Sequence, residues 1–362
     1  VAFTLSKSQT PDQKPFKILK KHDGGITALA FSPDGKVLVT GSEDKTLLIW
    51  NTATWECSRP LTGHTQAVNS VSFLASGTRF YSGGDYYVRS WNLKGDALDA
   101  YRGPTTHIWS VALKPDSSQW VAGSFEKNIK LFDYKTTKVS NIGGHTKSAL
   151  AVAYSPDGKL MASGSLDENI FIRNTSDYKI IDTLKGHSGN IFSLTFSPDG
   201  KYLASASNDQ DVRVWDVSQG KLLQTFRGHT GAVFSVAFSA DGSYLASGSA
   251  DSNVLIWEIG NGEKLAELSG HTSAVNEVAF HPSGKYLASA SLDKTVALWN
   301  FGPDLIAGHY FSAEMNQERE QSGLFVPKGN NEDKKAYQER LAKAEEFNRL
   351  LAENIILSIL HP

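Results

Sequence analysis

Histidine, hydroxyl, aspartate and tryptophan residues recur along this chain at nearly constant spacing. The four most regular sets are His22, Thr40, Asp44 and Trp50; His187, Ser205, Asp209 and Trp215; His229, Ser247, Asp251 and Trp257; and His271, Ser289, Asp293 and Trp299. Serine, histidine and aspartate are the nucleophile, base and orienting acid of a hydrolase triad. These residues can therefore serve either acyl transfer or a structural hydrogen-bond network.

The repetition favours the network. A catalytic site is one constellation beside a cleft and an oxyanion hole, whereas these sets return in most units of the chain. We expect each aspartate to accept hydrogen bonds from the histidine and from turn amides, and each buried indole to find a partner. The sequence therefore predicts no catalytic residues.

The elements that position these residues form a repeat. The tryptophan position is occupied, at intervals of 41, 41, 41, 42, 42 and 42 residues, by Trp50, Trp91, Phe132, Arg173, Trp215, Trp257 and Trp299. Each unit contains short apolar runs, such as 202–205 and 233–238, separated by turns such as Ser-Pro-Asp-Gly at 197–200. This pattern predicts four short strands per unit. Because such a small sheet cannot bury both faces alone, we expect the units to stack around an axis.

The Gly-His, Ser-Pro-Asp-Gly, Ser-Gly-Ser-x-Asp and Trp-Asp elements of these units resemble the WD-repeat family. The resemblance implies an all-β, seven-bladed β-propeller over residues 16–300, closed by an N-terminal strand at 16–20 that pairs with the last repeat. It also implies that the recurring polar sets lie inside the blades. The evenness of repeats 5 to 7 resembles bacterial WD-repeat proteins, whose propellers often serve as a sensor or scaffold.

Repeats 2 to 4 depart from this pattern. Repeat 2 keeps His64, Asp85 and Trp91 but places Tyr81 at the hydroxyl position. Repeat 3 has Pro104, Ala122, Glu126 and Phe132 in the four positions. Repeat 4 replaces the tryptophan with Arg173. Either these changes are neutral, or the irregular half carries the specific surface.

The resemblance also places partner-binding side chains on the narrow face around the central channel. One such position lies near the start of each innermost strand, and is assigned to Thr27, Asn69, Trp109, Ala151, Phe192, Phe234 and Asn276. A second position lies two residues earlier in each repeat and includes His107. The third position is the residue just before the turn aspartate. The large apolar or aromatic side chains at these three positions are the predicted partner-binding residues: His107, Trp109, Phe125, Leu166, Phe192, Phe234 and Leu292.

Composition excludes several other functions. The net charge is -2 and no run of basic residues follows one stripe, which argues against nucleic acid as a partner. No apolar run is long enough to span a bilayer. The single cysteine, Cys57, excludes an intramolecular disulfide and a multi-cysteine zinc site, and fits a reducing compartment. We expect a cytoplasmic protein without metal or cofactor.

The remaining segments are a short extension over 1–15, an irregular connection over 301–330 and an amphipathic helix over 331–362. Tyr337, Leu341, Ala344, Phe347, Leu351 and Ile355 recur at helical spacing. The apolar side of this helix needs a cover, which is either the propeller itself, a second copy of the chain or another protein.

Three functions are compatible with these observations. The leading hypothesis is a non-catalytic scaffold or sensor module that binds a protein or peptide on the narrow face. An alternative is a structural subunit of a larger assembly, docked through the C-terminal helix. An enzyme with its site at the channel mouth is disfavoured, since the chain has no P-loop, His-Glu-x-x-His or Cys-x-x-Cys motif.

Overall fold

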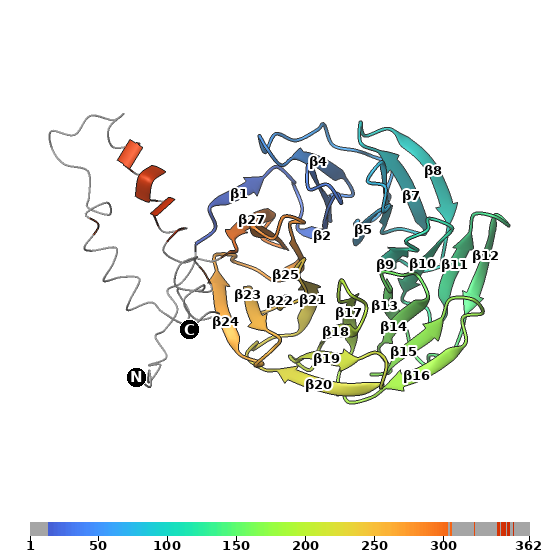
Figure 1. The fold of residues 1–362 in the computed structure, drawn as a ribbon. Helices are drawn as coiled ribbons and strands as arrows, with labels where there is room; N and C mark the ends of the chain where they lie inside the picture. The colour runs from blue at the N-terminus through green and yellow to red at the C-terminus, as the bar shows by residue number, and fades with distance from the viewer. Residues whose placement is uncertain are drawn as a thin grey trace. The chain divides into compact units, whose positions relative to one another are not determined.

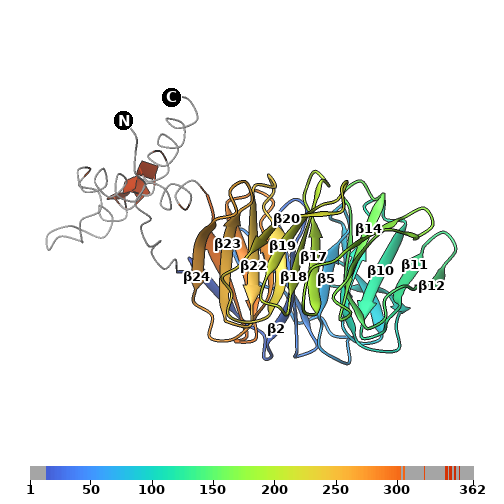
Figure 2. The ribbon, with the colours of Figure 1, turned by 90° about the horizontal axis from the view of Figure 1, so that it is seen from below.

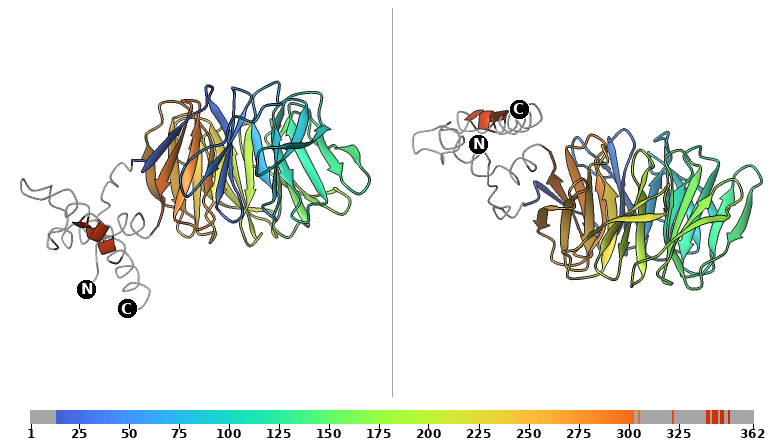
Figure 3. Two further views of the ribbon diagram at one scale, coloured as in Figure 1. Left: turned by 90° about the horizontal axis from the view of Figure 1, so that it is seen from above. Right: turned by 60° about the horizontal axis from the view of Figure 1, so that its bottom comes forward.

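The computed structural model describes residues 14–302 and, beyond them, residues 305, 322, 339, 340, 342–344, 346, 347 and 350. Residues 17–300 contain 27 strands in seven antiparallel sheets, which stand as blades around a common axis (Figure 1). Figures 2 and 3 show the same ring from its edge. The predicted all-β, seven-bladed propeller is therefore confirmed.

The strands of blades 1 to 4 follow the repeat in chain order. Blade 1 holds β2 (Ile26–Phe31), β3 (Val37–Ser42) and β4 (Leu47–Asn51). Blade 2 holds β5 (Ser70–Phe73), β6 (Arg79–Gly83), β7 (Tyr87–Asn92) and β8 (Ala97–Arg102). Blade 3 holds β9 (Ile108–Leu113), β10 (Gln119–Ser124), β11 (Ile129–Asp133) and β12 (Lys138–Ile142). Blade 4 holds β13 (Ala149–Tyr154), β14 (Leu160–Ser165), β15 (Ile170–Asn174) and β16 (Ile180–Leu184).

Blades 5 to 7 continue this order, and in every blade the first strand in sequence is the innermost. Blade 5 holds β17 (Ile191–Phe196), β18 (Tyr202–Ser207), β19 (Val212–Asp216) and β20 (Lys221–Phe226). Blade 6 holds β21 (Val233–Phe238), β22 (Tyr244–Ser249), β23 (Asn253–Glu258) and β24 (Lys264–Ser269). Blade 7 holds β25 (Val275–Phe280), β26 (Tyr286–Ser291) and β27 (Thr295–Asn300), and takes its fourth strand from β1 (Lys17–Lys20).

The second strand of each blade shows no alternation of buried and exposed residues. Strands such as β18 and β26 are buried from their second residue to their last, because each face of a blade packs on a neighbouring blade. Small alanine, serine and glycine side chains allow this close packing, and larger residues such as Leu203 and Trp215 fill the space between blades. The core is thus divided among the blade interfaces.

The ring closes between the two ends of the propeller's sequence. β1 pairs antiparallel with β27, from Lys17 opposite Leu298 to Lys20 opposite Thr295, and the two strands lie side by side in Figure 1. Leu19 points into the core with 4% exposure, while its neighbour Ile18 is 54% exposed. The predicted closing strand is present, and it removes the unpaired edge of blade 7.

Blade 1 differs from the predicted four strands. Its outer segment pairs with β4 only through isolated bridges, Leu47 to Leu61 and Trp50 to Cys57. The amide of Ile49 donates instead to the side-chain hydroxyl of Ser58 at 3.1 Å, and Pro60 has no amide to offer a ladder. A regular fourth strand therefore does not form here.

Only part of the predicted C-terminal helix lies within the described residues. Residues 339, 340, 342–344, 346, 347 and 350 are helical. Ala344 is buried, whereas Leu350 is 45% exposed. The rest of 331–362 lies outside the described residues. No helix in the described part of the chain is long and apolar enough to cross a membrane.

Candidate functional site

The recurring polar residues form one hydrogen-bond chain in each regular blade. In blade 5, the indole Nε1–H of Trp215 donates to Ser205 Oγ at 2.9 Å, and that oxygen lies 2.7 Å from His187 Nε2. His187 Nδ1 lies 2.8 Å from Asp209 Oδ2, which also accepts from the Ser188 amide. Because a carboxylate only accepts, Nδ1 carries the histidine proton, and the serine hydroxyl donates to Nε2.

The same contacts recur within 0.2 Å in three further blades. In blade 6 they join His229, Ser247, Asp251 and Trp257. In blade 7 they join His271, Ser289, Asp293 and Trp299. In blade 1 they join His22, Thr40, Asp44 and Trp50. The hydroxyl residues are 0% exposed in all four blades, so no substrate can reach the one atom that would act as a nucleophile.

The turn carboxylates stay ionised in this network. Burial alone would raise the pKa of Asp44, but hydrogen bonds from Thr46 and His22 outweigh burial and hold that pKa at about 2. Burial lowers the pKa of His22, even though Asp44 favours its protonated form. A neutral histidine between an ionised aspartate and a hydroxyl matches the donor and acceptor order described above.

The assignment of Tyr81 to the hydroxyl position of blade 2 was wrong. Ser82 Oγ lies 2.7 Å from His64 Nε2 and accepts from Trp91 Nε1 at 2.8 Å. The turn before Asp85 is one residue shorter than in other blades, so counting back from the aspartate gave the wrong register, whereas the 18-residue distance from the histidine is unchanged. Blade 2 therefore keeps its full network.

Blade 3 replaces the network by other contacts, whereas blade 4 keeps the contacts among His145, Ser163 and Asp167 and replaces only the tryptophan. In blade 3, Glu126 Oε1 accepts from both the amide and the hydroxyl of Thr105, while Phe132 stacks on Trp120 at 5.3 Å. In blade 4, Arg173 fills the tryptophan position at 2% exposure and donates to the carbonyl oxygens of Gly143 and Tyr178. Both blades thus remain packed without the tryptophan.

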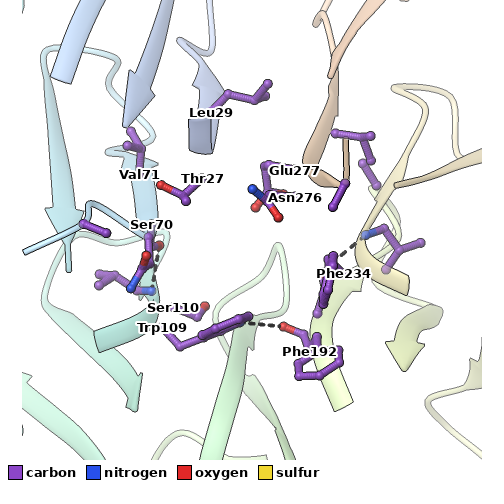
Figure 4. A pocket seen from close by; sticks show the side chains of 18 of the residues that line it. Thr27, Leu29, Ser70, Val71, Trp109, Ser110, Phe192, Phe234, Asn276 and Glu277 are labelled. Carbon is purple, nitrogen blue, oxygen red and sulfur yellow. Dashed lines mark hydrogen bonds between the residues drawn. The ribbon is translucent and has the colours of Figure 1, made fainter. Parts of the chain in front are cut away.

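The predicted partner-binding residues gather partly around a channel of about 690 Å³ in the middle of the ring. Trp109, Phe192 and Phe234 line it (Figure 4). Leu292 also belongs to the lining. The ring centroids of Trp109 and Phe192 are 5.7 Å apart, those of Phe192 and Phe234 are 5.3 Å apart, and Phe125 meets Trp109 edge-on at 5.9 Å. We call these four aromatic residues, Phe125, Trp109, Phe192 and Phe234, the aromatic arc.

The arc owes its continuity to Trp109. Its indole Nε1–H donates to the carbonyl oxygen of Phe192 at 3.2 Å, so the side chain reaches from blade 3 to blade 5. Phe125 at the end of the arc is 49% exposed, and the other three are half-buried. The arc therefore consists of three half-buried rings and one exposed ring.

The register assigned to blade 4 was also wrong. The residue that matches Trp109 and Phe192 is Leu150, because the bulge of β13 lies between Ala149 and Ala151 just as that of β17 lies between Ile191 and Ser193. Leu150 is 1% exposed. Blade 4, which lies between the blades of Trp109 and Phe192, therefore contributes no side chain of its own to the arc.

The other predicted partner-binding residues lie apart from the arc. His107 is exposed and contacts Tyr86, with ring centroids 5.6 Å apart. Leu166 is half-buried and does not line the channel. Leu292 is 37% exposed and lies on the blade 7 side of the channel, against Gly25 of blade 1. The seven residues therefore do not form one patch.

The opposite side of the channel carries polar side chains at this repeat position, beside apolar ones such as Leu29 and Leu292. Thr27 Oγ1 donates to the carbonyl oxygen of Val68 at 2.6 Å, and the amides of Asn69 and Asn276 donate to the carbonyl oxygens of Ile108 and Ile26 at 2.9 Å. Each bond ties one blade to the next. The position that is aromatic in blades 3, 5 and 6 thus holds the ring together in blades 1, 2 and 7.

Sequence reasoning missed Glu277, which projects from β25 into the channel (Figure 4). The matching residues of the other blades are Ala28, Ser70, Ser110, Ala151, Ser193 and Ser235. Glu277 Oε1 accepts from the Ser235 hydroxyl at 2.7 Å. Burial raises the pKa of Glu277 to about 7, although that hydrogen bond opposes the shift. Alignment of the repeats on their histidines would have revealed this single glutamate.

Metal chemistry finds no support in the described residues, where no three His, Cys, Asp or Glu side chains come together to hold an ion. The candidate site is therefore the channel mouth, with aromatic side chains on the side of blades 3, 5 and 6 and both polar and aliphatic side chains on the side of blades 7, 1 and 2.

Several curated proteins resemble parts of this chain. The 77 kDa echinoderm microtubule-associated protein of Strongylocentrotus purpuratus is 30% identical over 128 residues, which are 33% of this chain and 18% of that protein. A guanine nucleotide-binding protein subunit beta of Zea mays is 31% identical over 130 residues, 33% of this chain and 34% of that protein. The U3 small nucleolar RNA-associated protein 15 homolog of Xenopus tropicalis is 31% identical over 131 residues, 35% of this chain and 25% of that protein. The matched segments thus span 18% to 34% of the length of these relatives.

A family model described as the IFT122 first beta-propeller matches residues 25–217 and 190–315. These two matches together cover most of the seven blades, and the fold agrees with them. The chain therefore belongs to this family of WD-repeat β-propellers.

Proposed function

We propose that this protein is a non-catalytic interaction module that binds a protein or peptide partner over the mouth of its channel. The aromatic arc carries this proposal. Large aromatic side chains beside a pocket are typical anchors of protein interfaces, because they bury much apolar area at low entropic cost. A channel of about 690 Å³ is large enough to receive side chains of a partner.

The relatives support a role in assemblies. Their names include a subunit of a guanine nucleotide-binding protein and a microtubule-associated protein. A rigid ring of seven blades suits a scaffold or sensor, since its surface is formed before the partner arrives. We place this function in the cytoplasm, where a free cysteine such as Cys57 stays reduced.

The test is affinity capture of partners from the native cell lysate with a Phe125→Ala/Trp109→Ala variant. We expect the captured partner to decrease strongly, because the variant removes the exposed end of the arc and its link between blades 3 and 5. Phe125→Ala alone leaves the Trp109 bond to blade 5 intact and should give a smaller decrease.

A Leu222→Ala/Leu223→Ala variant provides the matched control. These side chains of β20 are 43% and 50% exposed on the outer edge of blade 5, so the control removes exposed apolar surface away from the channel. Equal capture by the arc variant and the control variant, with both folded, would rule the proposal out.

A further inference from the structure

The described side chains that line the channel include negative charges but no positive one. Two carboxylates, Glu43 and Glu277, line it, and its other described lining residues include no lysine, arginine or histidine. No basic side chain of the described residues perturbs the pKa of Glu277, whose shift arises from burial, the Ser235 hydroxyl and the Val278 amide. Glu277 is half-buried, and a carboxylate that is partly removed from water without a positive neighbour is costly, a cost that falls when a cation comes close.

The second observation is the wall that faces this carboxylate. Trp109, Phe192 and Phe234 line the same channel from blades 3, 5 and 6, whereas Glu277 comes from blade 7 (Figure 4). The faces of aromatic rings attract cations, and tryptophan does so most strongly. The aromatic wall and the carboxylate therefore favour the same kind of ligand.

The third observation is how Glu277 is held. Ser235 donates to Oε1 at 2.7 Å and also accepts the Val278 amide at 3.1 Å, so its hydroxyl is fixed between blades 6 and 7. A carboxylate oriented by a neighbouring blade is prepared for a ligand before it arrives. Glu43, whose Oε2 accepts from the Gly25 amide at 3.2 Å, adds negative charge to the lining from blade 1.

From these observations we infer that the channel receives one positively charged side chain of the partner, a lysine or an arginine, between Glu277 and the aromatic arc. This inference rests on the proposed function, because the partner reaches the channel through its mouth. The carboxylate forms a charge-assisted hydrogen bond to the ammonium or guanidinium group, and the apolar stem of the side chain packs on the rings.

The test uses short capped peptides and the indole N–H signal of Trp109 in NMR spectra. Of the eight tryptophans, Trp109 is the one that lines the channel, and a Trp109→Phe variant assigns its signal. The probes are Ac-Gly-Arg-Gly-NH2 and Ac-Gly-Lys-Gly-NH2, each paired with a neutral peptide of similar shape that contains citrulline or norleucine. We expect a saturable shift of the Trp109 signal with at least one cationic peptide and none with its neutral counterpart.

Glu277→Gln keeps the shape of the side chain and removes its charge. We expect this variant to bind the cationic peptide about tenfold or more weakly, and to leave the other seven indole signals in place as evidence of an intact fold. The inference is overturned if neither cationic peptide shifts the signal, if the neutral peptides shift it equally, or if Glu277→Gln binds as well as the original protein.

Capture from lysate separates this inference from the proposed function. If the proposed function holds and the inference fails, Glu277→Gln still captures the partner while the Phe125/Trp109 variant does not. If the proposed function itself fails, the Phe125/Trp109 variant captures as much as the Leu222/Leu223 control.

Discussion

At the scale of single residues, one hydroxyl group holds each regular network together. Ser205 donates to His187 and accepts from Trp215, so a single oxygen satisfies two groups that have no access to water. Blade 3 lacks the hydroxyl, the histidine and the tryptophan together, so its loss of the hydroxyl leaves neither partner unpaired. Removal of the hydroxyl alone leaves both partners buried and unpaired.

This arrangement predicts a large effect of Ser205→Ala on stability. Each of the two unpaired buried groups costs about 1–3 kcal/mol, so we expect the free energy of unfolding to fall by about 2–6 kcal/mol. Denaturant unfolding measures the change. Ser218→Ala removes an exposed hydroxyl that bonds only to Asp216 and should change the stability little. A Ser205 variant as stable as the Ser218 variant would show that the network contributes nothing.

The turn carboxylates predict a second effect, on stability in acid. Burial opposes the shift, but hydrogen bonds from histidines and amides lower the pKa of six of them: Asp44, Asp85, Asp167, Asp209, Asp251 and Asp293. A carboxylate whose pKa is lowered by folding stabilises the native state above its unfolded pKa, and this stability is lost as the pH falls through the folded pKa.

We therefore expect the melting temperature to drop between about pH 4, near the unfolded pKa, and about pH 2, the folded pKa of Asp44. Thermal unfolding over this range tests the prediction. Asp209→Asn should be less stable at pH 5 and should lose less stability on acidification, because one of the titrating groups is gone. A drop of the same size in the variant would assign the acid sensitivity to other groups.

At the scale of elements, the sequence predicted the ring but not every register. The number of blades, the closing strand and the order of the strands follow from spacing, because both faces of each blade must be buried. The assignment of Tyr81 failed because the turn before Asp85 is one residue shorter, and such a change shifts every side chain that is counted across it. The assignment of Ala151 was one residue too far along the chain, since Leu150 follows His145 at the same distance at which Phe192 follows His187. Counting forward from His64 and His145 identifies Ser82 and Leu150, in agreement with the contacts and the strand pairing.

The aromatic arc could be predicted only in part, for a related reason. Trp109, Phe192 and Phe234 stand out as large residues at one repeat position. That the Trp109 indole extends past blade 4 to the Phe192 carbonyl depends on the path of a long side chain. Spacing along the chain does not specify that path.

The closing strand predicts a third effect at this scale. Leu19→Ala removes a buried side chain from the junction of blades 7 and 1, and we expect a loss of about 2–5 kcal/mol in the free energy of unfolding. Ile18→Ala alters the next residue of the same strand, which is 54% exposed, and should change stability by about 0.5 kcal/mol or less. Similar losses in the two variants would mean that β1 contributes no core packing to the ring.

At the scale of the whole molecule, Glu277 is expected to favour a cationic ligand in the channel but to reduce the stability of the empty ring. A ring of seven blades packs most easily when its innermost strands carry small side chains, and six blades carry alanine or serine where blade 7 carries Glu277. The pKa of Glu277, raised to about 7 by burial, means that the folded ring disfavours the ionised form. The charge that suits a cationic ligand therefore reduces the stability of the empty ring.

Because the charge of Glu277 reduces the stability of the empty ring, we expect Glu277→Gln to stabilise the protein. A carboxylate whose pKa is raised by folding adds stability below its unfolded pKa, about 4.5, and loses that contribution as the pH rises through the folded value of about 7. The variant has no charge to desolvate, so its melting temperature should exceed that of the original protein at pH 8, and the difference should shrink at pH 5. Glu43→Gln, which alters an exposed carboxylate in the lining of the same channel, is the matched control at both pH values. A variant that is less stable than the original protein at pH 8 would indicate that the Ser235 contact outweighs the burial of charge, and that the empty channel already accommodates an ionised Glu277.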